Sequence, residues 1–137
     1  MNATIPTVAV HHLRLTVTDV ERSRRFYTEL LGFDVLLELP PGVLLTNGSV
    51  LLGMGPPPNP EKAIPADRFD ENRVGLDHLS FAVADRDELE KAAALLDEHG
   101  VLRGEITDLG EAFGIYILAF RDPDNIQLEL TAPYRAR

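Results

Sequence analysis

The chain has 137 residues, enough for one compact domain, and contains no cysteine, which excludes thiolate nucleophiles, cysteine metal ligands and disulfides. Thirteen basic and 22 acidic residues give a formal net charge of −9 at pH 7, and no basic stripe offers a surface for nucleic acid. The first residues lack the pattern of a secretory signal, and no apolar run is long enough to span a bilayer. We therefore expect a soluble, cytoplasmic protein that binds neither nucleic acid nor membranes.

The clearest feature of the chain is a strand pattern that occurs twice. The sequence HLRLTVTD at residues 12–19 is followed 66 positions later by HLSFAVAD at residues 78–85. Each copy alternates apolar residues with smaller or polar ones, as strands with one buried face do. His12 and His78 therefore open the more polar face of their strands, whereas the neighbouring His11 is expected to point to the opposite side. The repeat predicts a fold built from two similar halves.

A helix and three further strands are expected after the first copy. Asp19 is a suitable helix N-cap, and Gly32 ends the helical pattern. Turn signals at Pro40-Pro41-Gly42 and Asn47-Gly48 separate the strands. In chain order, we predict a helix over residues 20–31 and strands over residues 33–39, 43–46 and 50–54.

The second half repeats this order after a proline-rich connector at about residues 55–74, which we interpret as an extended strap. Asp85 with Glu88 three residues later resembles a capping box, and Gly100 ends the helix. Strands are predicted over residues 101–106, 115–120 and 126–131. The expected fold class is α+β, with two mostly antiparallel βαβββ modules, about 8–54 and about 75–132, in one domain over residues 1–137.

The last predicted strand supplies a candidate for metal chemistry. Gln127, Glu129 and Thr131 share its polar face. If the polar faces of the three strands line one cavity, His12, His78 and Glu129 converge as a facial set of metal ligands that leaves positions open for substrate. From spacing alone the alternative stays open that each histidine is an ordinary strand residue and that Glu129 pairs with Arg14.

The motifs themselves resemble a known superfamily. Residues 12–33, HLRLTVTDVERSRRFYTELLGF, are similar to the opening module of the vicinal oxygen chelate superfamily, the glyoxalase / bleomycin-resistance / dioxygenase group. The segments GLDHLSFAVAD (75–85) and FRDPDNIQLEL (120–130) resemble its closing module. The resemblance implies two βαβββ modules whose curled mixed sheets form a cleft that holds a divalent metal. It also implies that His12, His78 and Glu129 are the metal ligands.

Departures from the family patterns bear on the choice of activity. Glyoxalase I-like members add a carboxylate on the last strand of the first module, but residues 49–54 contain no acid, and Leu52 is the nearest equivalent. Extradiol dioxygenase-like members use a tyrosine upstream of the glutamate, where this chain has Ala119; Tyr116 could substitute only in a different register. Fosfomycin-resistance-like transferases keep only the two histidines and the glutamate, which fits this chain.

We interpret the sequence as that of a divalent-metal-dependent enzyme of this superfamily, a glyoxalase or fosfomycin-resistance-like lyase or transferase acting on a small oxygenated substrate. The resemblance implies that the metal, one of Mn, Fe, Ni or Zn, chelates two neighbouring substrate oxygens. Glu129 is the one evident candidate for a catalytic base. Arg14 is a candidate to orient an anionic substrate oxygen, with a plain salt bridge as the alternative, and Tyr116 is a candidate proton donor, with core packing as the alternative.

Two further interpretations of the sequence remain open. The chain could be a metal-free binding protein of the bleomycin-resistance type that sequesters an antibiotic, an interpretation favoured by Leu52 in place of an acid. It could also be an extradiol dioxygenase. Because modules in this superfamily come together within one chain or by exchange between chains, a homodimer is expected.

Overall fold

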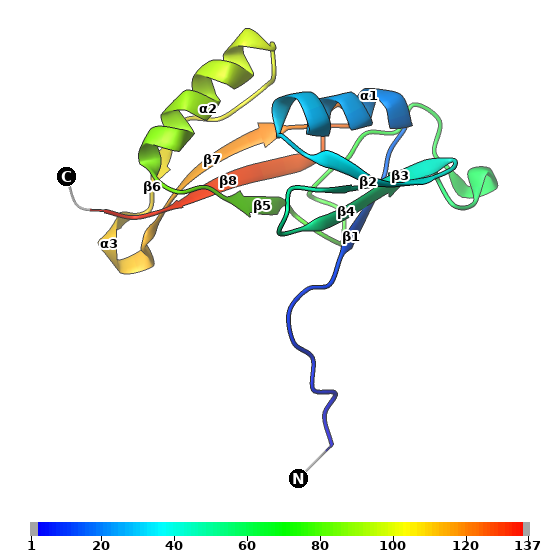
Figure 1. Cartoon of the computed structure of the whole chain (residues 1–137), viewed down its shortest axis with the longest axis horizontal. Helices are drawn as coiled ribbons and strands as arrows, with labels where there is room; N and C mark the ends of the chain where they lie inside the picture. The colour runs from blue at the N-terminus through cyan, green and yellow to red at the C-terminus, as the bar shows by residue number, and fades with distance from the viewer. Residues whose placement is uncertain (1–2, 136–137) are drawn as a thin grey trace. The chain divides into compact units, whose positions relative to one another are not determined.

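The computed structural model describes residues 3–135 and divides after Ala63 into two compact units. Each unit contains one β-α-β-β-β arrangement, as the sequence repeat predicts (Figure 1). The proline-rich connector contributes to both units, its first part to the first and its second part to the second. None of the helices within residues 3–135 is long and apolar enough to cross a membrane.

The first unit forms a four-stranded sheet in the order β1-β4-β3-β2. β1 pairs with β4 in parallel, and the other two pairs are antiparallel. The predicted helix begins at the Asp19 N-cap and continues as a π-helical segment to Leu30. The elements are β1 (Leu13–Thr16), α1 (Val20–Arg25), the π-helical segment (Phe26–Leu30), β2 (Asp34–Leu39), β3 (Gly42–Thr46), β4 (Leu51–Gly55) and a 3₁₀ turn (Pro60–Lys62).

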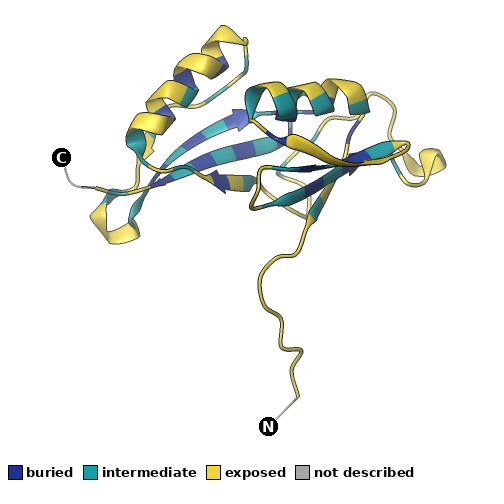
Figure 2. Ribbon diagram, viewed as in Figure 1, coloured by how far each residue is buried: buried dark blue, intermediate teal, exposed yellow. Residues whose placement is uncertain are grey.

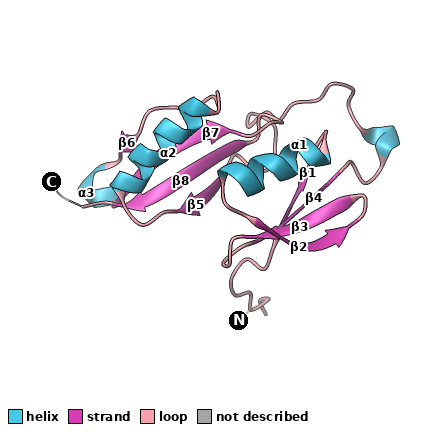
Figure 3. Cartoon of the chain, turned by 45° about the horizontal axis from the view of Figure 1, so that its top comes forward, coloured by secondary structure: helices cyan, strands magenta, loops and turns pink. Residues whose placement is uncertain are grey.

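The second unit repeats this topology in the order β5-β8-β7-β6, again with first and last strands parallel. Figure 3 shows α2 lying over the strands of this sheet, where it contacts β7 and β8. The elements are β5 (Leu79–Ala82), α2 (Arg86–Glu98), β6 (Thr107–Asp108), α3 (Gly110–Phe113), β7 (Ile115–Arg121) and β8 (Gln127–Pro133). The predicted α+β class is confirmed, and the two sheets are mixed.

Each helix covers one face of its own sheet and encloses a separate core. In the first unit the fully buried side chains include Tyr27, Leu45 and Leu52. In the second they include Leu118 and Leu128, and along β7 and β8 buried residues alternate with partly exposed ones (Figure 2). In the second sheet this period-two pattern separates a core face from a face that the helix does not cover, and on β8 the uncovered face carries Gln127, Glu129 and Thr131.

The predicted strand over residues 101–106 is wrong. The structure has an isolated bridge between Arg103 and Phe120 and a two-residue β6. Leu102 is 70% exposed and Gly104 has no side chain, so the segment has no alternating apolar face to hold it on the core. Two backbone bonds, from Gly104 N to Ala119 O (2.8 Å) and from Arg121 N to Leu102 O (3.0 Å), attach it to β7. The short helix α3 was not predicted either.

Helices α1 and α2 both begin at an aspartate N-cap, as the sequence repeat predicts. The Asp85 side chain accepts a hydrogen bond from Glu88 N at 3.0 Å, and Asp19 accepts one from Arg22 N at 3.1 Å. The second half of the expected capping box does not form, because the Glu88 carboxylate accepts from Lys91 Nζ instead (3.2 Å). Each of the two helices is therefore capped by a hydrogen bond from a backbone N–H to the aspartate side chain, without the reciprocal bond of a capping box.

We predict that Asp85→Ala lowers the free energy of unfolding by about 1 kcal/mol, because the backbone N–H of Glu88 loses its acceptor. Asp85→Ser, which keeps an acceptor at this position, should stay close to the wild-type value. Chemical denaturation followed by circular dichroism measures both variants. Equal stability of Asp85→Ala and the wild type would contradict the assignment of this cap.

Candidate functional site

In the second unit, two of the three predicted metal ligands lie together. The parallel register of β5 and β8 sets Ser80 opposite Glu129, so both side chains lie on the sheet face that the helix does not cover. His78, two residues before Ser80, lies beside them: its Nε2 is 3.3 Å from Glu129 Oε1. The Glu129 side chain is 15% exposed and that of His78 39% exposed. A sheltered carboxylate therefore faces an imidazole nitrogen at an accessible edge.

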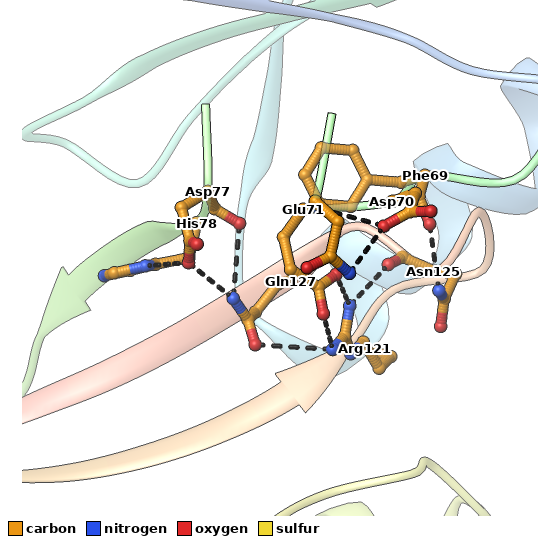
Figure 4. A network of polar contacts seen from close by, with 9 residues as sticks. Phe69, Asp70, Glu71, Asp77, His78, Arg121, Asn125 and Gln127 are labelled. Carbon is orange, nitrogen blue, oxygen red and sulfur yellow. Dashed lines mark hydrogen bonds and ion pairs between the residues drawn. The ribbon is translucent and has the colours of Figure 1, made fainter. Parts of the chain in front are cut away.

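The other ring nitrogen of His78 is held by the preceding residue. Nδ1 lies 2.8 Å from Asp77 Oδ1, and the same oxygen accepts from Gln127 Nε2 at 2.8 Å (Figure 4). Gln127 Oε1 accepts in turn from Arg121 Nη2 at 3.3 Å. A continuous series of polar contacts thus runs from the end of β7 to His78.

Arg121 is fixed by a bidentate ion pair. Its two terminal nitrogens donate to the two Glu71 carboxylate oxygens, each at 2.8 Å, and Nη1 also donates to Asn125 O at 3.1 Å. Hydrogen bonding from this guanidinium holds the pKa of Glu71 at about 2, well below its ordinary value. Glu71 belongs to the predicted connector, so this part of the connector is an integral piece of the second unit.

Asp77 and Arg121 were not predicted as site residues from the sequence. A signal was present for Asp77, since it immediately precedes the predicted ligand His78. Arg121 and Glu71 are 50 positions apart, and no local pattern in the sequence indicates that they pair.

In the first unit, His12 stands at the position that matches His78. Its Nδ1 lies 2.9 Å from His11 Nδ1, so one of the two rings donates to the other. The prediction that His11 points to the opposite side is wrong, because both residues precede the first residue of β1 and the strand alternation does not extend to them. In both units, therefore, the residue before the candidate ligand contacts its Nδ1 atom.

The strand register of the first unit shows that the predicted equivalent of Glu129, Leu52, is wrong. Arg14 lies opposite Gly53, as Ser80 lies opposite Glu129, so Gly53 rather than Leu52 is the matching residue. Leu52 is fully buried on the core face. The first unit consequently has no side chain at all where the second has its carboxylate.

The space left by two glycines is filled by Arg14. A Cβ at Gly53 would meet the Arg14 side chain at 3.7 Å, and one at Gly55 would lie 2.6 Å from Arg14 Nη2. The guanidinium donates to Thr16 Oγ1 and to Pro56 O, each at 3.3 Å. No carboxylate within residues 3–63 pairs with it, which leaves its positive charge available to a ligand.

His12 and Arg14 line one cavity in the first unit. Its volume is about 590 Å³, within the range of pockets that bind small molecules. Most of its wall is apolar, and Leu44, Leu51 and the segment from Pro56 to Pro58 contribute to it. The cavity thus combines mainly apolar walls with one cation, Arg14, and two imidazoles, His11 and His12.

Tyr116 lies on the other face of the second sheet. Its side chain is 3% exposed, stacks under Arg86 at 4.9 Å from the ring centre, and donates its hydroxyl hydrogen to Arg135 O at 2.7 Å. This placement favours the alternative of core packing over a substrate contact. Ala119 is the residue opposite Glu129, so β7 brings no hydroxyl to this point of the polar face.

Among residues 3–135, no group of three or more His, Asp or Glu side chains lies close enough together to hold a metal ion. His78 and Glu129 form the pair described above, and His12 belongs to the other unit. Two imidazoles and a carboxylate are a donor set that suits Mn, Fe, Ni or Zn.

Comparisons with known proteins agree on the relationship. A family model described as the Glyoxalase/Bleomycin resistance protein/Dioxygenase superfamily matches residues 9–130. Metallothiol transferase FosB of Staphylococcus haemolyticus is 29% identical over 123 residues, covering 88% of this chain and 81% of the relative. Uncharacterized protein YwkD of Bacillus subtilis is 32% identical over 132 residues, covering 89% and 94%. The crystal structure of a glyoxylase/bleomycin resistance protein/dioxygenase domain from Frankia sp. EAN1pec has a TM-score of 0.75 at 31% identity, covering 96% of each chain.

The ion pair that anchors the polar contacts predicts a pH-dependent stability. Because the folded-state pKa of Glu71 is about 2 and the ordinary value is 4.5, the stabilisation is complete above the ordinary value and is lost as the pH falls from there toward 2. We predict that wild type is more stable than Glu71→Gln at neutral pH and that the difference shrinks at about pH 2.5.

Urea denaturation at both pH values measures this difference. Glu111→Gln, which changes an exposed carboxylate on α3, is the control and should follow the wild type at both. A wild-type advantage over Glu71→Gln that is as large in acid as at neutral pH would contradict the role assigned to the ion pair.

Proposed function

Because the chain belongs to the glyoxalase/bleomycin resistance protein/dioxygenase superfamily, we propose that it is a divalent-metal-dependent enzyme that acts on a small oxygenated substrate. His12, His78 and Glu129 would hold the metal. The observation that carries the proposal is the close approach of His78 Nε2 and Glu129 Oε1 on the uncovered face of the second sheet, at 3.3 Å.

The donor chemistry supports this assignment. Asp77 occupies Nδ1 of His78, which leaves Nε2 as the nitrogen available to a metal. Glu129 is largely sheltered from water, and a sheltered carboxylate needs a positive partner, which a metal ion would provide. His12 supplies the third ligand in the proposal because it occupies the position in the first unit that His78 occupies in the second.

The metal, Arg14 and Glu129 would have different roles in the proposed reaction. When bound, the metal supplies Lewis acidity toward the oxygens of the substrate. Arg14 would bind an anionic oxygen and so orient the substrate within the cavity of the first unit. Glu129 is the candidate base, since a carboxylate that faces the substrate can take a proton from it.

Within the superfamily, the geometry favours a chemistry of the fosfomycin-resistance type. A glyoxalase I-like activity would call for an acid where this chain has Gly53, and a dioxygenase-like one for a tyrosine where it has Ala119. The similar protein FosB is a metallothiol transferase, which supports the proposal of a metal-dependent transferase. A homodimer stays a prediction.

One observation supports a second candidate function, a metal-free protein that binds an antibiotic or similar drug. The cavity of the first unit, at about 590 Å³, is large and mainly apolar, as a site for sequestering a drug would be. The two functions differ in their dependence on the three ligands. A binder would keep its ligand affinity without metal, whereas the enzyme would not turn over.

We predict that the protein purified without chelator or affinity tag contains close to one equivalent of a transition metal, and that Glu129→Ala loses it. Plasma mass spectrometry measures the content, and reloading with Mn, Fe, Ni or Zn followed by thermal denaturation identifies the preferred ion. Glu105→Ala, whose side chain is 94% exposed, is the matched control and should keep the metal. Absence of metal together with no thermal stabilisation by any of the four ions would favour the drug-binding function.

Arg14 is predicted to bind anions in the cavity. Loss of a charge-assisted hydrogen bond costs about 1.5–3 kcal/mol, so Arg14→Gln should weaken binding of methylphosphonate by roughly 10- to 100-fold. Nuclear magnetic resonance titration measures the affinity, with Arg25→Gln on helix α1 as the control for net charge.

A pair of glycine variants tests the same contact without removing the charge. Gly55→Ala should weaken binding because its Cβ would displace the guanidinium, whereas Gly53→Ala, at ordinary contact distance, should not. Unchanged affinity in both Arg14→Gln and Gly55→Ala would exclude Arg14 as the anion site.

A further inference from the structure

The contact between Asp77 and His78 has a chemical consequence for a metal ligand. A neutral imidazole carries one hydrogen, and the nitrogen that bears it cannot bind a metal. An ionised carboxylate accepts hydrogen bonds but does not donate them. Asp77 Oδ1 lies 2.8 Å from Nδ1 and Glu129 Oε1 lies 3.3 Å from Nε2, so each carboxylate attracts the ring hydrogen to its own side. The shorter contact, with Asp77, favours the form of His78 in which Nδ1 carries the hydrogen and Nε2 is bare.

We propose that Asp77 is a positioning residue, which fixes the tautomer and ring orientation of His78 so that Nε2 is presented beside Glu129. The inference rests on the proposed metal site and assigns a role to a residue outside it. Outer carboxylates of this kind orient a histidine ligand and raise its basicity, and their loss commonly weakens metal binding by about 10- to 100-fold.

The side-chain amide of Gln127 holds Asp77 in place. Arg121 Nη2 donates to Gln127 Oε1, and a guanidinium cannot accept a hydrogen bond, so the amide orientation is determined. Nε2 of Gln127 consequently points to Asp77, where it donates to Oδ1 at 2.8 Å and to the backbone oxygen at 3.2 Å. Both the carboxylate and the backbone of Asp77 are thereby restrained (Figure 4).

The far end of the series is anchored to the β7–β8 turn. Arg121 and Glu71 are 23% and 26% exposed, so their bidentate pair is partly protected from water. The segment that carries Glu71 is attached by two further bonds, from Phe69 N to Asp124 O at 2.9 Å and from Asn125 Nδ2 to Phe69 O at 3.0 Å. The chain that leads into His78 is therefore fixed to the same hairpin that carries Glu129, which keeps the imidazole and the carboxylate in register.

The first test uses the metal-free protein. The ¹⁵N shifts of the His78 ring, at about pH 8.5, where neutral imidazoles predominate, distinguish the two tautomers. Wild type should show hydrogen on Nδ1, and Asp77→Ala should lose this preference. Asp77→Asn, which keeps an acceptor oxygen, should restore it. Asp67→Ala, which removes an exposed aspartate of the same unit, is the control and should match the wild type.

The second test measures affinity for Zn²⁺ or Mn²⁺ by competition with a chelating dye. Asp77→Ala should bind about 10- to 100-fold more weakly than wild type, Asp77→Asn should be intermediate, and Gln127→Ala should show a smaller loss. The wild-type tautomer and an affinity within twofold of wild type in Asp77→Ala would overturn the inference.

An error in the proposed metal site can be distinguished from an error in the role of Asp77. If Glu129→Ala binds the metal as wild type does, the metal site is wrong whatever Asp77 does. Loss of the tautomer preference in Asp77→Ala without any metal binding by the wild type would likewise reject the metal site and, with it, the positioning of a ligand by Asp77.

Discussion

The backbone hydrogen bonds between β5 and β8 set the register on which the candidate site depends. This parallel pairing sets Ser80 opposite Glu129 and brings His78 to the same face. Side chains alternate along a strand, so a slip of one residue would turn Glu129 into the core and Leu128 toward solvent. The fully buried Leu128 and the other core residues of β8 resist that slip, and the hydrophobic core therefore determines which carboxylate faces the site.

The two units share one topology but carry side chains of opposite charge at matching positions. At the matching point of the two parallel pairs, the second unit has a carboxylate and the first has a glycine over which Arg14 lies. In the proposed function the second unit contributes a pair of metal ligands and the first a cation for the substrate, which an exact repeat of either unit could not supply. The difference between Gly53 and Glu129 on a shared fold is thus the physical basis for proposing that one unit contributes two of the metal ligands and the other orients the substrate.

Much of the fold follows from the sequence because its signals are local. Alternation at residues 12–19 and 78–85, with aspartate at each helix start, predicts the repeat that the structure has. The segment at residues 101–106 misleads because apolar composition there is not accompanied by alternation, and tertiary contacts decide its conformation. At the site, His78 and Glu129 could be predicted from strand faces, but the choice between Leu52 and Gly53 required the observed register. The pairing of Arg121 with Glu71 is wholly tertiary and has no counterpart in the sequence pattern.

The proposed metal site is tested by the anomalous difference density of crystals of the metal-loaded protein, recorded on both sides of the absorption edge of the bound ion. We predict one strong peak within coordination distance of His12, His78 and Glu129, with Nε2 as the ligand atom of His78. A peak that contacts neither His78 nor Glu129, or no peak in protein shown by solution analysis to contain the ion, would contradict it.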